Sequence, residues 1–192
     1  MWPWEHVAFG YVLYSLGSHA IRREPPAEWT VFALGLGTLV PDLVDKPLSW
    51  SLGLFPTGYS VAHSALVAVP TVAGFYVVGR WTGRDRYALA FGVGYLSHLV
   101  GDVVYPVVLG GSLAPERVLW PVVALPPYED RVGFTGRALR YLLDFLGDVL
   151  AGQAGHLLAF EGSLALAVLA LWLYDGRPGV DALWSLFARP DR

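Results

Sequence analysis

The strongest constraint on the fold of this chain is the length of its apolar stretches. Between Lys46 and Arg80 the sequence has no Asp, Glu, Lys or Arg, and several other stretches are nearly as poor in charge. Over 192 residues, 55% are hydrophobic and 15% are charged, whereas soluble domains carry about 25% charged residues. The sequence therefore predicts an integral protein of the cell membrane, with residues 1–192 forming a single membrane-embedded domain.

The apolar stretches predict an all-α fold, because a helix of about 20 apolar residues crosses the hydrocarbon core of a bilayer. Five membrane-spanning helices are expected, over residues 4–21, 28–44, 59–79, 87–109 and 152–174. Segment 134–151 has charges at steps of three and four among leucines, which is typical of an amphipathic helix on the membrane surface. The apolar segment 118–127 is too short to span and is expected to be re-entrant or interfacial. Pro41 should break the second span, so that Asp42 and Asp45 face inward on irregular backbone.

The basic residues predict how the chain is oriented. They are more frequent after the first, third and fifth predicted spans than in the connections on the other side. Basic residues favour the cytoplasmic side of a membrane. We therefore expect the N-terminus outside and the C-terminus in the cytoplasm.

Composition also narrows the classes of partner and site. The chain has no Cys, which excludes disulfides and thiolate metal sites. The net charge is −3 and the basic residues are scattered along the sequence, so nucleic acid is not expected as a partner. Membrane lipids are the expected surroundings.

Placing an ionisable side chain at the bilayer centre costs about 2.5–3.5 kcal/mol, so we expect such a side chain inside a span to have a structural or functional role. His98 and Asp102 are spaced i, i+4, which puts both side chains on one helical face, one turn apart. Such a pair can bind a divalent metal ion, or it can form a buried hydrogen bond that only tightens packing. Asp42 and Asp45, three residues apart, can share or bridge metal ions, or they can mark a span end where acids meet water.

In the five-span arrangement, the candidate residues all fall toward the outer side of the membrane. These predicted metal ligands are His6, Asp42, Asp45, His63, His98 and Asp102. Nitrogen and oxygen ligands suit Zn²⁺, Mn²⁺ or Fe²⁺, with zinc the first expectation. Asp45 or Asp102 is expected to act as general base where it is not a ligand. His19 falls at the opposite end, and His156 and Glu161 are reserve candidates on the outer side.

Other polar side chains are expected to orient the imidazoles through their second ring nitrogen. The candidates for this role are Ser64, Ser97 and Tyr95.

Several short motifs occur in a fixed order along residues 4–125. They are His6, Pro41-Asp42 with Asp45, His63-Ser64, His98 with Asp102, Gly110-Gly111 and Leu119-Trp120-Pro121. This ordered set resembles the membrane-bound metal-dependent hydrolase family, also called the LexA-binding, inner-membrane-associated (YdjM-like) hydrolases. Two departures stand out. Val44 is inserted into the family's Pro-Asp-x-Asp pattern, and Pro56 and Thr57 replace the first His and the Arg of its His-Arg-Gly-x-Thr-His-Ser element.

The resemblance implies metal-dependent hydrolysis. The helix with His98 and Asp102, followed by Pro106, is also distantly similar to a ligand helix of the zinc-dependent phospholipase C superfamily, which implies phosphodiester substrates. A site at the lipid boundary would suit a lipid or lipid-linked phosphoester. Two alternatives stay open: an ion or metal transporter with an intramembrane His and Asp pathway, and a non-catalytic membrane protein that keeps the site as a vestigial or structural metal or hydrogen-bond cluster. The missing His-Arg pair favours the second of these.

Overall fold

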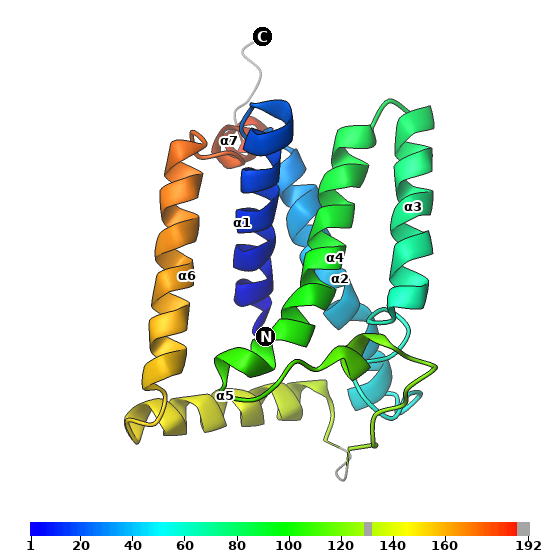
Figure 1. Ribbon diagram of the computed structural model, residues 1–192, viewed down its shortest axis with the longest axis vertical. Coiled ribbons are helices and arrows are strands. Elements are labelled where there is room, and N and C mark those ends of the chain that lie inside the picture. The colour runs from blue at the N-terminus through cyan, green and yellow to red at the C-terminus, as the bar shows by residue number, and fades with distance from the viewer. Residues whose placement is uncertain (129–131, 188–192) are drawn as a thin grey trace.

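A computed structural model describes residues 1–128 and 132–187, and the regular secondary structure in this part of the chain is entirely helical (Figure 1). It contains seven α-helices and a short 3-10 helix, and no strand. The elements are α1 (Pro3–Arg22), α2 (Thr30–Trp50), α3 (Ala65–Trp81), α4 (Asp85–Val108), η1 (Pro115–Val118), α5 (Phe134–Leu150), α6 (Gly155–Tyr174) and α7 (Val180–Phe187). The all-α class predicted from the sequence is confirmed.

Five of the helices form a bundle. Figure 1 shows α1, α2, α3, α4 and α6 running side by side, with α5 lying across the end of the bundle at which α1 begins. By length and composition, α4 and α6 are apolar enough to cross a membrane, whereas α3 is apolar but has only 17 residues. α1 and α2, with 20 and 21 residues, are long enough but carry several buried polar side chains.

The distribution of polar and apolar residues is inverted relative to a soluble domain. Many large hydrophobic side chains lie on the outside, among them Trp81 (83% exposed) and Leu166 (70% exposed), and α6 has no buried residue. The interior contains His, Asp, Ser and Thr side chains beside buried Tyr, Leu and Ala. Soluble proteins rarely expose apolar surface on this scale, so the outer face of the bundle is suited to lipid.

Helices α2 and α4 are the most closely packed pair in the bundle. A Cβ atom added at Gly37 would lie 2.2 Å from the carbonyl oxygen of Phe91, and one added at Gly94 would lie 2.3 Å from that of Leu34. Only glycine allows backbones this close, as is common where membrane helices pack. The close approach brings the backbone of α2 against the side chains of α4, and this contact positions the polar cluster described below.

The prediction that Pro41 breaks its helix is wrong. α2 continues from Thr30 to Trp50 through both Pro41 and Pro47. Proline removes one backbone N–H, and neighbouring helices compensate for such a loss in membrane proteins; here the tight packing of α2 on α4 holds the helix together. The expectation of inward-facing carboxylates is confirmed, since Asp42 and Asp45 are both buried.

Three other segments differ from expectation or add to it. The third predicted span starts too early, because residues 59–64 form a loop whose backbone is bound by Asp45 and α3 begins only at Ala65.

Residues 119–128 form turns and irregular structure after η1 and contain no re-entrant helix. The short helix α7 was not predicted; the Glu28 carboxylate accepts hydrogen bonds from the backbone N–H groups of Gly179 and Ala182 at its start.

Candidate metal centre

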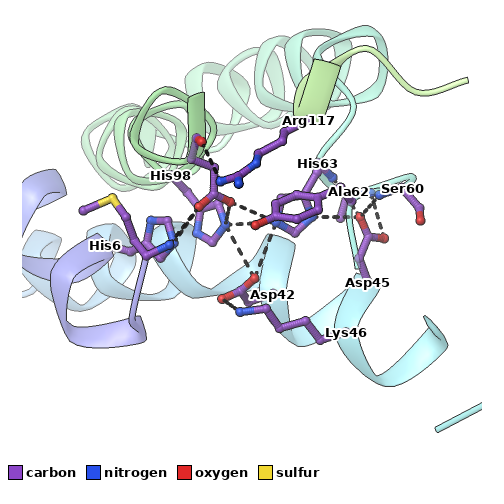
Figure 2. A network of polar contacts seen from close by, with 12 residues as sticks. His6, Asp42, Asp45, Lys46, Ser60, Ala62, His63, His98 and Arg117 are labelled. Carbon is purple, nitrogen blue, oxygen red and sulfur yellow. Dashed lines mark hydrogen bonds and ion pairs between the residues drawn. The ribbon is translucent and has the colours of Figure 1, made fainter. Parts of the chain in front are cut away.

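The structure brings the six predicted ligand residues into one network of polar contacts. They come from four parts of the chain: His6 from α1, Asp42 and Asp45 from α2, His63 from the loop before α3, and His98 and Asp102 from α4. Each is at most 7% exposed. Figure 2 shows the side chains of His6, Asp42, His63 and His98 pointing toward one another. Their convergence at one end of the bundle agrees with the common depth expected from the sequence.

Asp102 contacts all three imidazoles of the cluster. Its Oδ2 lies 3.3 Å from Nε2 of His98 and 3.4 Å from Nε2 of His63. Its Oδ1 lies 3.4 Å from Nε2 of His6 and 3.2 Å from the amino group of Met1. The predicted i, i+4 pair is therefore the centre of the cluster.

Asp42 approaches the same imidazoles from the α2 side. Its Oδ1 lies 3.4 Å from Nε2 of His63 and 3.7 Å from Nε2 of His98. Two groups of ligand atoms, one from His6, His98 and Asp102 and the other from Asp42, His63 and His98, each lie within 4.8 Å of one another and could hold a metal ion. His98 belongs to both groups.

Backbone and carboxylate acceptors fix the two central imidazoles from behind. Nδ1 of His98 donates to the carbonyl oxygen of Thr38 at 2.6 Å, and Nδ1 of His63 donates to Oδ2 of Asp45 at 2.9 Å. Because a carbonyl and a carboxylate can only accept, each ring carries its hydrogen on Nδ1 and presents Nε2 to the cluster. This is the orientation that metal-binding histidines adopt.

The resulting arrangement calls for a cation. Nε2 of His98 and Nε2 of His63 lie 3.1 Å apart, and with hydrogens on both Nδ1 atoms their lone pairs face one another. Such a pair of lone pairs is satisfied by a second proton on one ring, or His63 and His98 could both serve as ligands of a cation. The ring of His6 stacks on that of His98 with centroids 3.6 Å apart. Within the described residues its buried Nδ1 has no hydrogen-bond partner, and its Nε2 approaches only the Asp102 carboxylate, at 3.4 Å. Buried nitrogens with so few partners fit a metal-binding donor set.

Asp45 lies behind the cluster and organises the loop that carries His63. Its carboxylate accepts backbone N–H bonds from Ser60, Ala62 and His63 at 2.9, 3.1 and 3.0 Å, in addition to the bond from the His63 ring. Both oxygens are engaged in this way, and Asp45 is outside the two groups of candidate ligands.

The expectation that Ser64, Ser97 or Tyr95 orients an imidazole is wrong. Their hydroxyls donate instead to the backbone carbonyls of Trp120, Gly94 and Ala62, respectively. A backbone carbonyl such as that of Thr38 has no residue signature, so periodicity and composition could not identify it as the orienting group.

Two basic side chains lie beside the cluster. Lys46 forms an ion pair with Asp42, and the i, i+4 spacing of this pair on a helix could have indicated it. Arg117, from η1, donates from Nη1 to the carbonyl oxygen of Asp102 at 3.1 Å. Nothing in the sequence around Arg117 indicated this contact, because it depends on the path of the loop after α4.

The reserve candidates lie outside the cluster. His156 is exposed near the start of α6, and Glu161 accepts a bond from Nε1 of Trp4 at 3.2 Å. His19 belongs to a separate network at the opposite end of α1, where its Nε2 donates to Asp175 at 2.6 Å.

The Asp175 network joins α1 to the end of α6. Its carboxylate also accepts bonds from the hydroxyls of Tyr11 at 2.6 Å and Ser15 at 2.7 Å. Burial raises the pKa of Asp175, but the hydrogen bonds from Tyr11, His19 and Ser15 outweigh burial and hold the pKa below its ordinary value. Asp175 therefore stays ionised and ties the outermost helix of the bundle to α1.

Comparison with known proteins identifies a family. No curated protein and no solved structure matches the chain. The family model described as YdjM inner membrane protein matches residues 1–179, which include every residue of the cluster. This is the family that the ordered motifs resemble, and the match covers nearly all of the 192 residues. The chain belongs to the YdjM inner membrane protein family.

Proposed function

We propose that this protein is a multi-pass inner-membrane hydrolase that depends on a divalent metal ion. The observation that supports this most directly is the 3.1 Å approach of Nε2 of His63 to Nε2 of His98, with both Nδ1 atoms bonded to acceptors. A divalent cation between the rings would satisfy both lone pairs. When bound, such a cation lowers the pKa of a water ligand and polarises a scissile ester or phosphoryl group.

The five residues whose side chains face the centre are the proposed ligands. They are His6, Asp42, His63, His98 and Asp102. Three imidazoles and two carboxylates suit zinc first and Mn²⁺ or Fe²⁺ next. We assign Asp45 to positioning, because both of its oxygens already accept hydrogen bonds. Asp102 has two oxygens that face different imidazoles, so one can bind the metal while the other accepts a proton from water.

The proposed membrane arrangement has five spans, formed by α1, α2, α3, α4 and α6, with the N-terminus outside. It rests on the distribution of Arg residues, the apolar outer face of the bundle and the family match. In this arrangement α5 lies at the outer interface, with Leu143 and Leu150 exposed to lipid. The metal centre is then near the outer surface of the membrane, which suits a lipid or lipid-linked ester as substrate.

A second candidate function is a non-catalytic membrane protein with a structural polar cluster. Two contacts favour it: Lys46 pairs with Asp42, and the amino group of Met1 pairs with Asp102. These cations neutralise two buried carboxylates without a metal ion. The chain also has no His-Arg pair shortly before His63, and this absence of the family's pair points in the same direction.

Metal analysis of the purified protein separates the two candidates. The full chain is purified in detergent, loaded with zinc, desalted and measured by mass spectrometry alongside the His98→Ala and His156→Ala variants. His156 is the matched control because it is exposed and outside the cluster. We expect about one zinc ion per chain in the wild type and in His156→Ala, and loss of zinc in His98→Ala. Equal zinc content in all three proteins would favour the second candidate function, in which the polar cluster is structural.

A further inference from the structure

Arg117 places a guanidinium group at the edge of the proposed metal centre. The residue belongs to η1, and Figure 2 shows its side chain extending from that element to the cluster. Its Nη1 donates to the carbonyl oxygen of Asp102 at 3.1 Å, and the guanidinium lies 5.1 Å from the centroid of the Tyr59 ring. That ring in turn packs on the imidazole of His63, with centroids 5.0 Å apart. Arg117 is therefore held in place by two contacts that both lead to ligand residues.

The charge of Arg117 is not neutralised by a carboxylate within the described residues. Lys46 differs in this respect, since it pairs directly with Asp42. A guanidinium has five N–H donors, and Arg117 uses one of them on a backbone carbonyl. The remaining donors and the full positive charge stay available beside the ligands.

A fixed guanidinium next to a divalent-metal centre selects for a particular substrate chemistry. Its planar fork matches the spacing of oxygens on a phosphoryl group and forms charge-assisted hydrogen bonds with them. A carboxylic ester carries no formal negative charge and would gain little from this residue. The position of Arg117 therefore favours binding of a phosphoric ester over a carboxylic ester.

We propose that the substrate of this centre is a phosphoric ester and that Arg117 binds its non-bridging oxygens. The inference rests on the proposed function. In the hydrolysis, the oxygen of water forms a bond to phosphorus and the bond from phosphorus to the alcohol oxygen breaks. One proton of the water passes to the Asp102 carboxylate and then to the departing alcohol oxygen. The products are the free alcohol and the phosphate, with no change of oxidation state.

Binding of orthophosphate to the metal-loaded protein tests the inference without relying on turnover. The wild type, Arg117→Gln, Arg117→Lys and Arg80→Gln are compared by isothermal titration calorimetry in detergent, after the zinc content of each has been measured. Arg80 is the matched control because it pairs with Asp85 at the other end of α4. We expect orthophosphate affinity to fall about tenfold to a hundredfold in Arg117→Gln, as for loss of hydrogen bonds to a charged group. The loss should be smaller in Arg117→Lys, which keeps the charge, and absent in Arg80→Gln.

The outcomes separate this inference from the proposed function. If no protein binds zinc, the proposed function fails and this inference fails with it. If zinc binds but orthophosphate does not, or if Arg117→Gln binds orthophosphate as tightly as the wild type, the inference is overturned while the proposed function stands. Should Arg117→Gln fail to fold, the comparison of Arg117→Lys with Arg80→Gln decides in the same way.

Competition then identifies the source of the phosphoryl group. Glycerol phosphate and a short-chain phosphatidate are each titrated against bound orthophosphate, with a short-chain diacylglycerol as the uncharged ester. Displacement by phosphatidate alone assigns a lipid substrate, and displacement by both phosphates assigns recognition of the phosphoryl group itself. Displacement by diacylglycerol but by neither phosphate would contradict the inference.

Discussion

Asp45 lies outside the two groups of candidate ligands and holds His63, whose Nδ1 lies 2.9 Å from Oδ2 of Asp45. The same carboxylate accepts three backbone N–H bonds from residues 60–63. One side chain of α2 therefore fixes both the path of the loop and the direction of the imidazole. On α4, the carbonyl oxygen of Thr38 holds the ring of His98 in the same way. Both central imidazoles are therefore oriented before any ion binds.

This relationship predicts that Asp45→Ala weakens zinc binding without removing a proposed ligand. Loss of a group that orients a metal-binding histidine costs about 10–100-fold in metal affinity, and we expect a decrease of that size. The measurement is zinc competition against a chelator of known affinity, with Asp85→Ala as a control far from the centre. Complete loss of zinc, as in His98→Ala, would instead indicate that Asp45 is itself a ligand.

A second prediction concerns the close contact of α2 and α4. A Cβ atom at Gly37 would lie 2.2 Å from the Phe91 carbonyl oxygen, whereas one at Gly35 would meet nothing within 4 Å. Gly37→Ala should therefore destabilise the protein by about 1–3 kcal/mol through overpacking, and Gly35→Ala should have little effect. Thermal unfolding in detergent measures both variants. If Gly37→Ala unfolds at the wild-type temperature, the backbones do not approach as closely as described.

The third prediction concerns Asp175 and its dependence on pH. Asp175→Asn replaces a carboxylate that accepts bonds from Tyr11, Ser15 and His19. Hydrogen bonds to a charged group contribute about 1.5–3 kcal/mol, so we expect a loss of this order at neutral pH. Because the pKa of Asp175 is lowered in the folded protein, its contribution is present above the ordinary carboxyl pKa and is lost as pH falls through the lowered value.

Unfolding measured from neutral to strongly acidic pH checks this dependence, with Asp181→Asn as the control. The difference between wild type and Asp175→Asn should shrink as the solution becomes acidic. A difference that grows toward acidic pH would show that the carboxylate is not stabilised in its ionised form.

The fourth prediction is the orientation in the membrane. Reporter fusions after Arg23 and Arg84 should be cytoplasmic, and fusions after Gly53 and Gly133 should be outside, because the Arg residues concentrate on one side. A cytoplasmic Gly133 would place the metal centre at the inner surface and would contradict the five-span arrangement.

The sequence predicted the centre well where periodicity determines geometry. The i, i+4 spacing of His98 and Asp102 fixes a shared helical face, and the common depth of the spans placed His6, Asp42 and His63 near them. For His6, Asp42, His98 and Asp102 these are consequences of helix rise and span length, which depend little on loops. His63 instead lies in the loop before α3, where Asp45 holds it.

The parts that could not be predicted depend on tertiary packing. The carbonyl of Thr38 reaches His98 only because glycines let α2 and α4 approach closely. Pro41 was expected to break its helix, and packing against α4 overrides that local preference. Arg117 reaches the centre through a loop whose path no repeat or spacing specifies.

The last prediction separates a metal centre from a structural cluster through Lys46, the only lysine in the chain. Its ammonium pairs with the buried carboxylate of Asp42. Lys46→Met would leave that charge without its lysine partner, and removing one partner of a buried ion pair costs about 3–5 kcal/mol. In the presence of chelator, we therefore expect Lys46→Met to unfold at a markedly lower temperature than the wild type.

Added zinc should reverse most of this loss if Asp42 is a ligand, because the metal ion then supplies the missing positive charge. Thermal unfolding of Lys46→Met is measured with chelator and with zinc, and Arg80→Met, in which an exposed basic residue is removed, is the control. Recovery specific to Lys46→Met would place the metal ion beside Asp42. An equal loss of stability with and without zinc would mean that Lys46 itself is the permanent counterion, and the non-catalytic protein would then be the better description.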